Sequence, residues 1–222
     1  IGIDHKDFLK KGTIDEIVYE KCSHLLEGSM IIVSEQNNEV LKKINKIIDN
    51  NSSKKIIFGK DFTCTKNIKN FIYSDGVGEL NLPLPNLLGD FQVNNVATAI
   101  ATARNLNKFN ISESHINKAI RNIKSEGRLQ NITQGKLRDL VSKNNQILID
   151  GAHNTLAASK IKKYLETLNS KKKIIVLLGM MENKEHRKFI EILKNSIHSI
   201  VALDIPNQIN FMQKEKLAEI AH

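Results

Sequence analysis

The sequence predicts an α/β protein built of two units. Short apolar segments that suit strands alternate with longer amphipathic segments that suit helices, which is the pattern of parallel βαβ units. Of the 222 residues, 41% are hydrophobic, which is enough for an ordinary buried core. No internal repeat or low-complexity linker interrupts the pattern. We place the domain boundary near residue 130, so that residues 1–130 and 131–222 form the two units.

The N-terminal unit begins with a capping box, Thr13-Ile-Asp-Glu16, which opens a helix that Gly28 should close. Between residues 61 and 84 the turn residues Asp75-Gly76 and Val77-Gly78 predict a hairpin. The remaining elements of this unit are predicted as strands at 30–33 and 55–58 and as helices at 39–48, 91–106 and 112–123.

The C-terminal unit is predicted from three apolar strands separated by helices. Three strands are few for a closed α/β domain, so we expect the chain to stop before the domain ends. Its first residue is Ile1 rather than Met, so we also expect it to begin inside a longer protein. The predicted strands are 147–150, a buried strand 173–178, and 199–203; the predicted helices are 155–168, 183–197 and 213–221.

The formal charge of +9 permits polyanionic partners such as nucleic acid or a nucleotide triphosphate. The lysines are spread along the chain, however, which favours a solvated basic surface. Cys22 and Cys64 match neither a disulfide framework nor a metal-binding CxxC spacing, so we expect a cytoplasmic location. No apolar run approaches the roughly 18 to 20 residues that a membrane span needs.

Two candidate positions lie near the N-terminus. His5, in Asp4-His5, follows what is predicted as a strand end, where ligands of α/β sheets gather, although a structural histidine is the more common case. Lys21 lies four residues after Ile17 and four before Leu25, on the apolar stripe of its helix. An inward-facing lysine must pair, snorkel outward, shift its pKa or be modified, for example as a carbamate that binds a cation.

Three further segments combine glycine with polar residues. Asn95 follows Gly89-Asp-Phe-Gln at the start of an Ala-rich helix, where an amide can face a base edge or simply water. Arg128 follows Gly127 near the predicted domain junction, where a guanidinium can bind a phosphate in a forked manner. Asp150-Gly-Ala-His153-Asn154 ends a strand just before a helix, so Asp150 is predicted either to meet a ribose hydroxyl or, with Asn154, to cap the helix.

These segments occur in the order seen in the folylpolyglutamate synthase family, relatives of the Mur ligases. Asp150-Gly-Ala-His-Asn154 resembles the family's Asp-Gly-Ala-His-Asn motif, and Gly127-Arg-Leu-Gln130 its Gly-Arg-Leu-Gln element. Leu82-Pro-Leu-Pro-Asn-Leu-Leu-Gly89, with Gln92 and Asn95 after it, is similar to its Gly-x-His-Gln-x-x-Asn-Ala motif. Ile3-Asp-His5 with Glu20-Lys21 is similar to its metal-binding segment.

The resemblance implies part of a Mur-ligase-like central ATPase domain, followed by a smaller Rossmann-like domain. It also implies an ATP- and Mg²⁺-dependent ligase that joins L-glutamate to dihydropteroate or folate through an acyl phosphate, in a monomer without nucleic acid or membrane partners. Asn95, Arg128 and Asp150 would bind ATP with His153 beside them. His5 would bind magnesium, and Lys21 would be carboxylated. We expect Arg128 and Asp150 to converge across a cleft between the two units.

Several departures from the family pattern bear on activity. The Walker-type glycine loop, the upstream pteroate-binding segment and the family's final strand are absent from this sequence. Phe91 stands where the family has His, Val96 replaces Ala, and the spacing from His5 to Lys21 carries an extra residue around Lys10-Lys11. We therefore predict that the 222-residue chain alone does not catalyse ligation.

Three alternatives remain open at this stage. One is a Mur-type ligase that acts on a cell-wall nucleotide precursor, because the architecture is shared. The second is a non-catalytic basic module that binds nucleic acid, although only 5% of the residues are aromatic and most of these fall in apolar patterns. The third is a fragment of a decayed gene that has no function.

Overall fold

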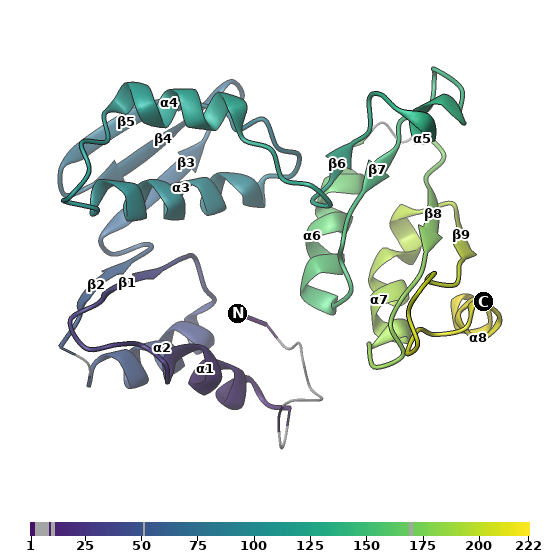
Figure 1. Cartoon of the computed structure of the whole chain (residues 1–222), viewed down its shortest axis with the longest axis horizontal. Coiled ribbons are helices and arrows are strands. Elements are labelled where there is room, and N and C mark those ends of the chain that lie inside the picture. The colour runs from purple at the N-terminus through teal and green to yellow at the C-terminus, as the bar shows by residue number, and fades with distance from the viewer. Residues whose placement is uncertain (3–8, 10–11, 51, 169–170) are drawn as a thin grey trace. The chain divides into compact units, whose positions relative to one another are not determined.

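The chain divides into two compact units in the computed structural model, residues 1–2 with 9–126 and residues 127–222. The structure describes residues 1–2, 9, 12–50, 52–168 and 171–222. Helices alternate with parallel strands in both units, which confirms the predicted α/β class (Figure 1). The division falls between Glu126 and Gly127, whereas the sequence pattern places the boundary near residue 130.

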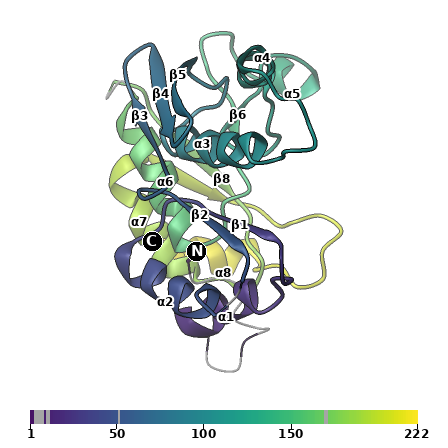
Figure 2. The same cartoon turned by 90° about the vertical axis from the view of Figure 1, so that its left-hand side faces the viewer.

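A parallel pair of strands, β1 (Met30–Val33) and β2 (Lys54–Ile57), begins the N-terminal unit. One face of the pair packs through Ile31, Val33 and Ile57 against helices α1 (Ile14–Cys22) and α2 (Asn38–Ile48) (Figure 2). The other face contributes Met30, Ile32 and Ile56 to a second core. Both faces of this short parallel sheet are therefore covered, as such sheets require.

Helix α1 begins as predicted and ends earlier than predicted. The Thr13 hydroxyl accepts a hydrogen bond from the Glu16 backbone N–H at 3.4 Å, and the Glu16 carboxylate accepts the Thr13 backbone N–H at 3.3 Å, so the capping box is confirmed. The helix ends at Cys22 rather than at Gly28. Gly28, at φ +73°, instead belongs to a turn in which the Ser29 N–H donates to the Leu26 carbonyl.

The rest of this unit is an antiparallel sheet covered on one face by two helices. Residues 61 to 84 form three strands rather than the single predicted hairpin. The extra reversal, at Asn67 to Lys69, was not predicted because it contains no glycine or proline. The strands are β3 (Phe62–Lys66), β4 (Asn70–Asp75) and β5 (Gly78–Pro83), and the helices are α3 (Phe91–Arg104) and α4 (Glu113–Asn122).

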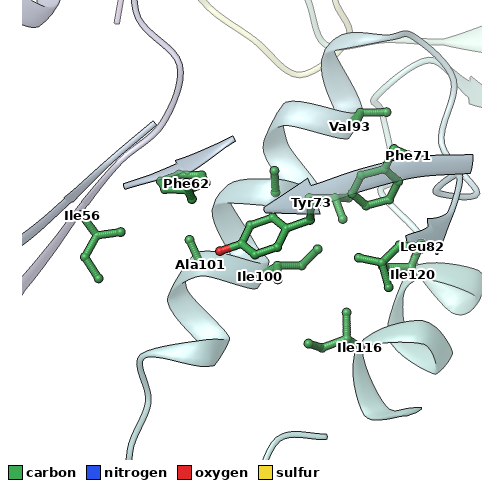
Figure 3. Packing of buried hydrophobic residues seen from close by; sticks show 12 residues of the cluster. Ile56, Phe62, Phe71, Tyr73, Leu82, Val93, Ile100, Ala101, Ile116 and Ile120 are labelled. Atoms are coloured by element: carbon green, nitrogen blue, oxygen red, sulfur yellow. The ribbon is translucent and has the colours of Figure 1, made fainter. Parts of the chain in front are cut away.

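The core between this sheet and its helices is aromatic. Phe62, Phe71 and Tyr73 lie on the covered face, and each is at most 1% exposed. They pack against Val93, Ile100 and Ala101 of α3 and against Ile116 and Ile120 of α4, as Figure 3 shows. The Tyr73 hydroxyl donates to the Asp75 carboxylate at 2.9 Å, so this large side chain is buried without losing its polar partner.

The C-terminal unit contains a second parallel pair, β8 (Ile175–Leu178) and β9 (Ser199–Ala202). Helices α6 (Thr155–Glu166), α7 (His186–Leu193) and α8 (Lys214–Ala221) share one core with this pair. A 3-10 turn at Lys194–Ser196 follows α7. Two elements were not predicted: β6 (Gln130–Asn131), which pairs antiparallel with β7 (Leu148–Ile149), and α5 (Lys136–Asp139).

The expectation that β8 is a fully buried strand is wrong for the described chain. Leu178 is 7% exposed and faces the helices, but Ile175 and Leu177 are 59% and 65% exposed. Val201 of β9, which pairs with Leu177, is also exposed, at 45%. The strand is apolar on both faces because parallel strands normally are, and the described helices cover only one of them.

Candidate functional site

The predicted acid, Asp150, ties two loops together at the end of β7. One oxygen of its carboxylate accepts the Leu129 N–H at 2.7 Å, and the other accepts the Ala152 N–H at 2.8 Å. The Gly151 N–H adds a bond of 2.8 Å to the Gly127 carbonyl. The two loops, residues 127–130 and 150–154, therefore form one rigid assembly, which we call the Asp150 clamp.

The first loop of the clamp has an unusual backbone. Gly127 lies at φ +64° and Leu129 at φ +46°, a left-handed conformation that a leucine rarely adopts. Leu129 is held there because its side chain is 3% exposed and its N–H is bound by Asp150. The Gln130 side-chain carbonyl accepts the Gly127 N–H at 2.9 Å and completes the turn.

This backbone turns Arg128 outward while its neighbour Leu129 is buried. Arg128 is exposed, and one terminal nitrogen of its guanidinium lies 3.7 Å from the position that a Cβ would take on Gly151. The guanidinium thus lies beside the second loop of the clamp, near the start of α6. An exposed guanidinium with a planar fork of donors suits phosphate or carboxylate oxygens.

The second loop leads into helix α6. The Asn154 side-chain oxygen accepts the Ala157 N–H at 2.8 Å, so Asn154 is the helix cap, as one of the two predicted interpretations had it. His153 is half-buried, and its Nδ1 lies 2.8 Å from the Gly151 carbonyl. A carbonyl only accepts, so Nδ1 carries a proton and donates to it.

Together these loops combine three features that suit an anionic, hydroxyl-bearing ligand. Arg128 supplies a mobile positive charge, the N-terminus of α6 supplies the positive end of a helix dipole, and Asp150 retains lone pairs beyond its two backbone bonds. Arg128 and Asp150 belong to the same unit, so the expectation that they meet across a cleft between units is wrong. The structure brings them together on adjacent loops.

Asn95 lies in the N-terminal unit, as the fifth residue of α3. It is exposed, and its amide nitrogen donates to the side-chain oxygen of Gln92 at 3.0 Å; Gln92 is only 4% exposed. Val96, which departs from the family pattern, is 5% exposed and belongs to the aromatic core, so its larger side chain is used in packing.

A polar cluster beside Asn95 was missed from the sequence. The Asn94 side-chain oxygen lies 3.1 Å from the Cys64 sulfur, and its amide nitrogen donates to the Glu35 carboxylate. Burial, with a smaller contribution from the Glu35 charge, raises the pKa of Cys64 to about 11. Glu35 follows the end of β1, and an acid at a strand end is the one sequence signal that could have indicated this cluster.

The structure describes only one of the two residues that were predicted to associate with a metal. His5 lies outside the described residues. Lys21 is in the last turn of α1 and is exposed, so the expectation that it faces the core is wrong: the helix ends at Cys22, and Leu25 no longer continues the stripe. Among the residues that the structure describes, no three His, Cys, Asp or Glu side chains group as metal ligands would.

The comparisons with known proteins define first a class. Residues 127–222, which are the whole C-terminal unit, match the Mur ligase glutamate ligase domain family. This unit is therefore similar to the glutamate ligase domain of the Mur ligases.

The similar proteins all come from one branch of that class. Over 203 residues, 89% of the chain, it is 28% identical to a dihydrofolate synthase/folylpolyglutamate synthase of Buchnera aphidicola subsp. Acyrthosiphon pisum and covers 44% of that protein. Its fold matches E. coli FolC in complex with ADP, with a TM-score of 0.84 and 24% identity, over 100% of this chain and 50% of that one.

A second solved structure supports the same fold. A bifunctional folylpolyglutamate synthase/dihydrofolate synthase with Mn, AMPPNP and L-glutamate bound matches 99% of this chain and 49% of that one, with a TM-score of 0.79 and 22% identity. The chain therefore spans about half the length of the proteins it matches. The predicted resemblance to the dihydrofolate synthase/folylpolyglutamate synthase branch of the Mur ligases is confirmed. No described helix is long and apolar enough to span a membrane.

Proposed function

We propose that the chain is the nucleotide-contacting half of an ATP-dependent ligase that joins L-glutamate to dihydropteroate or folate. The observation that carries the proposal is the Asp150 clamp, which holds Arg128 beside Gly151, on the loop that leads into α6, in a unit similar to the glutamate ligase domain. Relatives with the same fold have been solved with ADP and with Mn, AMPPNP and L-glutamate. We also propose a cytoplasmic monomer.

In this reaction a substrate carboxylate oxygen attacks the γ-phosphorus of ATP and ADP leaves, which gives an acyl phosphate. The amine nitrogen of glutamate then attacks the acyl carbon, phosphate leaves, and the amine loses a proton. Arg128 would bind phosphate oxygens as a forked donor and offset their negative charge. Asp150 would accept a hydrogen bond from a ribose hydroxyl through its remaining lone pairs, and His153 would lie beside the nucleotide.

We also propose that residues of the N-terminal unit contact the nucleotide and a magnesium ion. Asn95 is exposed near the start of α3, where its amide would face the edge of an adenine. His5 would be a magnesium ligand, and Lys21, exposed at the end of α1, would assist as a carbamate. A magnesium ion, when bound, would neutralise charge on the transferring phosphoryl group.

The test is ADP binding to the 222-residue chain, measured by titration calorimetry. Arg128→Ala should weaken ADP binding about tenfold or more, since hydrogen bonds to charged groups are among the stronger ones. Arg187→Ala is the matched control, because Arg187 is also an exposed arginine of the C-terminal unit. Equal ADP affinity in the two variants would contradict the proposed role of Arg128.

Catalysis is tested separately, in the longer protein of which we propose that this chain is one half. We expect that protein to release phosphate with dihydropteroate and glutamate, and not with a muramyl-nucleotide precursor. The 222-residue chain alone should release none, because the glycine loop that cradles ATP phosphates is absent from its sequence. Phosphate release by the chain alone would overturn that expectation.

A further inference from the structure

A cavity in the N-terminal unit, away from Asn95, has the features of a ligand site. Its volume is about 390 Å³, and it lies where the β4–β5 turn, the C-terminal end of α3 and the loop before α4 meet. Binding sites for small molecules typically have volumes of this order, with apolar walls and a few polar groups. The walls here are Val77, Leu80, Leu106, Phe109, Ile111 and Ile116, with Arg104, Asn107 and Glu113 as polar members.

Arg104 is the unusual member of this lining. Its side chain is 14% exposed, and its Nε lies 3.3 Å from the Asp75 carboxylate, which is itself 10% exposed. Its guanidinium carbon also lies 5.8 Å from the centre of the Tyr73 ring. One terminal nitrogen, Nη1, is buried and has no hydrogen-bond partner among the residues described. A buried donor without a partner is costly, so an acceptor that reached it would be bound favourably.

The surroundings of this nitrogen indicate what kind of acceptor would suit it. Asp75 already balances the charge of Arg104, and its other oxygen is occupied by the Val77 N–H at 2.9 Å. Glu113 adds a negative charge to the lining. A second anion would therefore leave the site with excess negative charge, whereas a neutral carbonyl oxygen satisfies the donor at no such cost.

The apolar part of the lining indicates the rest of the ligand. Phe109 and Leu106 are 65% and 43% exposed, and Val77 is 81% exposed. A flat apolar group placed between these side chains would remove their surface from water, and an aromatic ring would add a favourable contact with the ring of Phe109. The Glu113 carboxylate is suited to accept an N–H from the same ligand.

We propose that this cavity binds a small neutral aromatic carboxamide, with its carbonyl oxygen on Arg104 and its ring against Phe109. The proposal is independent of the ligase function, because it uses none of the residues assigned to ATP. Arg104 lines the cavity, so its guanidinium is the donor that a ligand oxygen would meet there. The bond between Arg104 Nε and Asp75 is kept.

The experiment is a titration of the 222-residue chain with benzamide, followed by backbone amide NMR shifts. We expect saturable shifts confined to residues 77–80 and 103–116, with a dissociation constant on the order of millimolar for so small a ligand. Benzoate, which has the same shape and a negative charge, should bind at least fivefold more weakly. Absent shifts, or shifts spread over both units, would overturn the site; tighter binding of benzoate would overturn the charge argument.

Two variants test the contact with Arg104 and the contact with Phe109 separately. Arg104→Lys keeps a positive charge for Asp75 and removes the guanidinium fork, so benzamide should bind about tenfold more weakly. Phe109→Ala changes an exposed side chain, which keeps the test valid if Arg104→Lys unfolds, and should weaken binding about threefold. Ile68→Ala, at a residue that is 93% exposed in the β3–β4 turn, is the control and should change nothing. Unchanged affinity in Phe109→Ala would contradict the proposal.

Discussion

The Asp150 clamp predicts a specific loss of stability in the variant Asp150→Asn. An asparagine of the same shape keeps one acceptor oxygen and places an NH₂ group against the other backbone N–H, either that of Leu129 or that of Ala152. One charge-assisted hydrogen bond is lost, and a donor then faces a donor. Hydrogen bonds to charged groups contribute about 1.5 to 3 kcal/mol, so we expect the C-terminal unit to lose about 2 kcal/mol.

Hydrogen exchange measures this loss where it occurs. A loss of about 2 kcal/mol in local stability corresponds to roughly thirtyfold faster exchange of the Leu129 and Ala152 amides. Amides of β3 and β4 belong to the other unit and should exchange at an unchanged rate. The control is Asp139→Asn, which neutralises an exposed acid of the same unit. If Asp150→Asn and Asp139→Asn exchange alike at residues 129 and 152, the carboxylate does not hold the loops together and the reasoning is refuted.

Three further predictions concern the backbone, a thiol and a helix cap. Gly127→Ala should destabilise the C-terminal unit by about 1 kcal/mol in urea unfolding, because Gly127 lies at φ +64°, and the space around its Cβ position is open, so no clash contributes. Gly76→Ala is the control and should have little effect, because Gly76 also has open space but no positive φ. At pH 8, Cys64 should react with iodoacetamide far more slowly than a free thiol, and its rate should rise as the pH passes about 11. Glu35→Gln should speed the reaction, because it removes a negative charge that opposes the thiolate. Fast alkylation of Cys64 at pH 8, measured by mass spectrometry, would contradict the raised pKa. Thr13→Ala should cost about 1 kcal/mol in thermal unfolding, and Thr13→Ser, which keeps the capping oxygen, should cost little.

Much of the fold was predictable because helices and strands of this chain carry clear periodicity. The parallel strands β1 and β9 lie within a residue of their predicted bounds, and α2, α3, α4 and α6 lie within about two residues at each end. The elements β6 and α5 were missed because two and four residues are too few to show a period. The early end of α1 was missed because Gly28 signals a turn equally well whether or not a helix precedes it.

The candidate site was predictable as residues and not as geometry. A strand-end acid followed by glycine and a helix indicates Asp150, and a glycine before an arginine indicates Arg128. The bonds that join their loops could not be predicted, because they depend on Leu129 in a left-handed conformation that its residue type disfavours. The exposure of Lys21 was missed for a related reason: the helical stripe places it inward only if the helix continues past Cys22.

The clamp also determines how variants of this site must be interpreted. Both oxygens of Asp150 are bonded to backbone N–H groups, so any substitution there disturbs the loop that carries Arg128 as well as a ligand contact. Loss of nucleotide binding in an Asp150 variant would therefore not distinguish a ribose contact from a displaced arginine. Arg128 is exposed on a loop that Asp150, Gln130 and Gly151 hold through backbone groups, so its side chain can be removed without loosening the loop. At Arg128, unlike at Asp150, a loss of affinity therefore reports on the ligand contact itself.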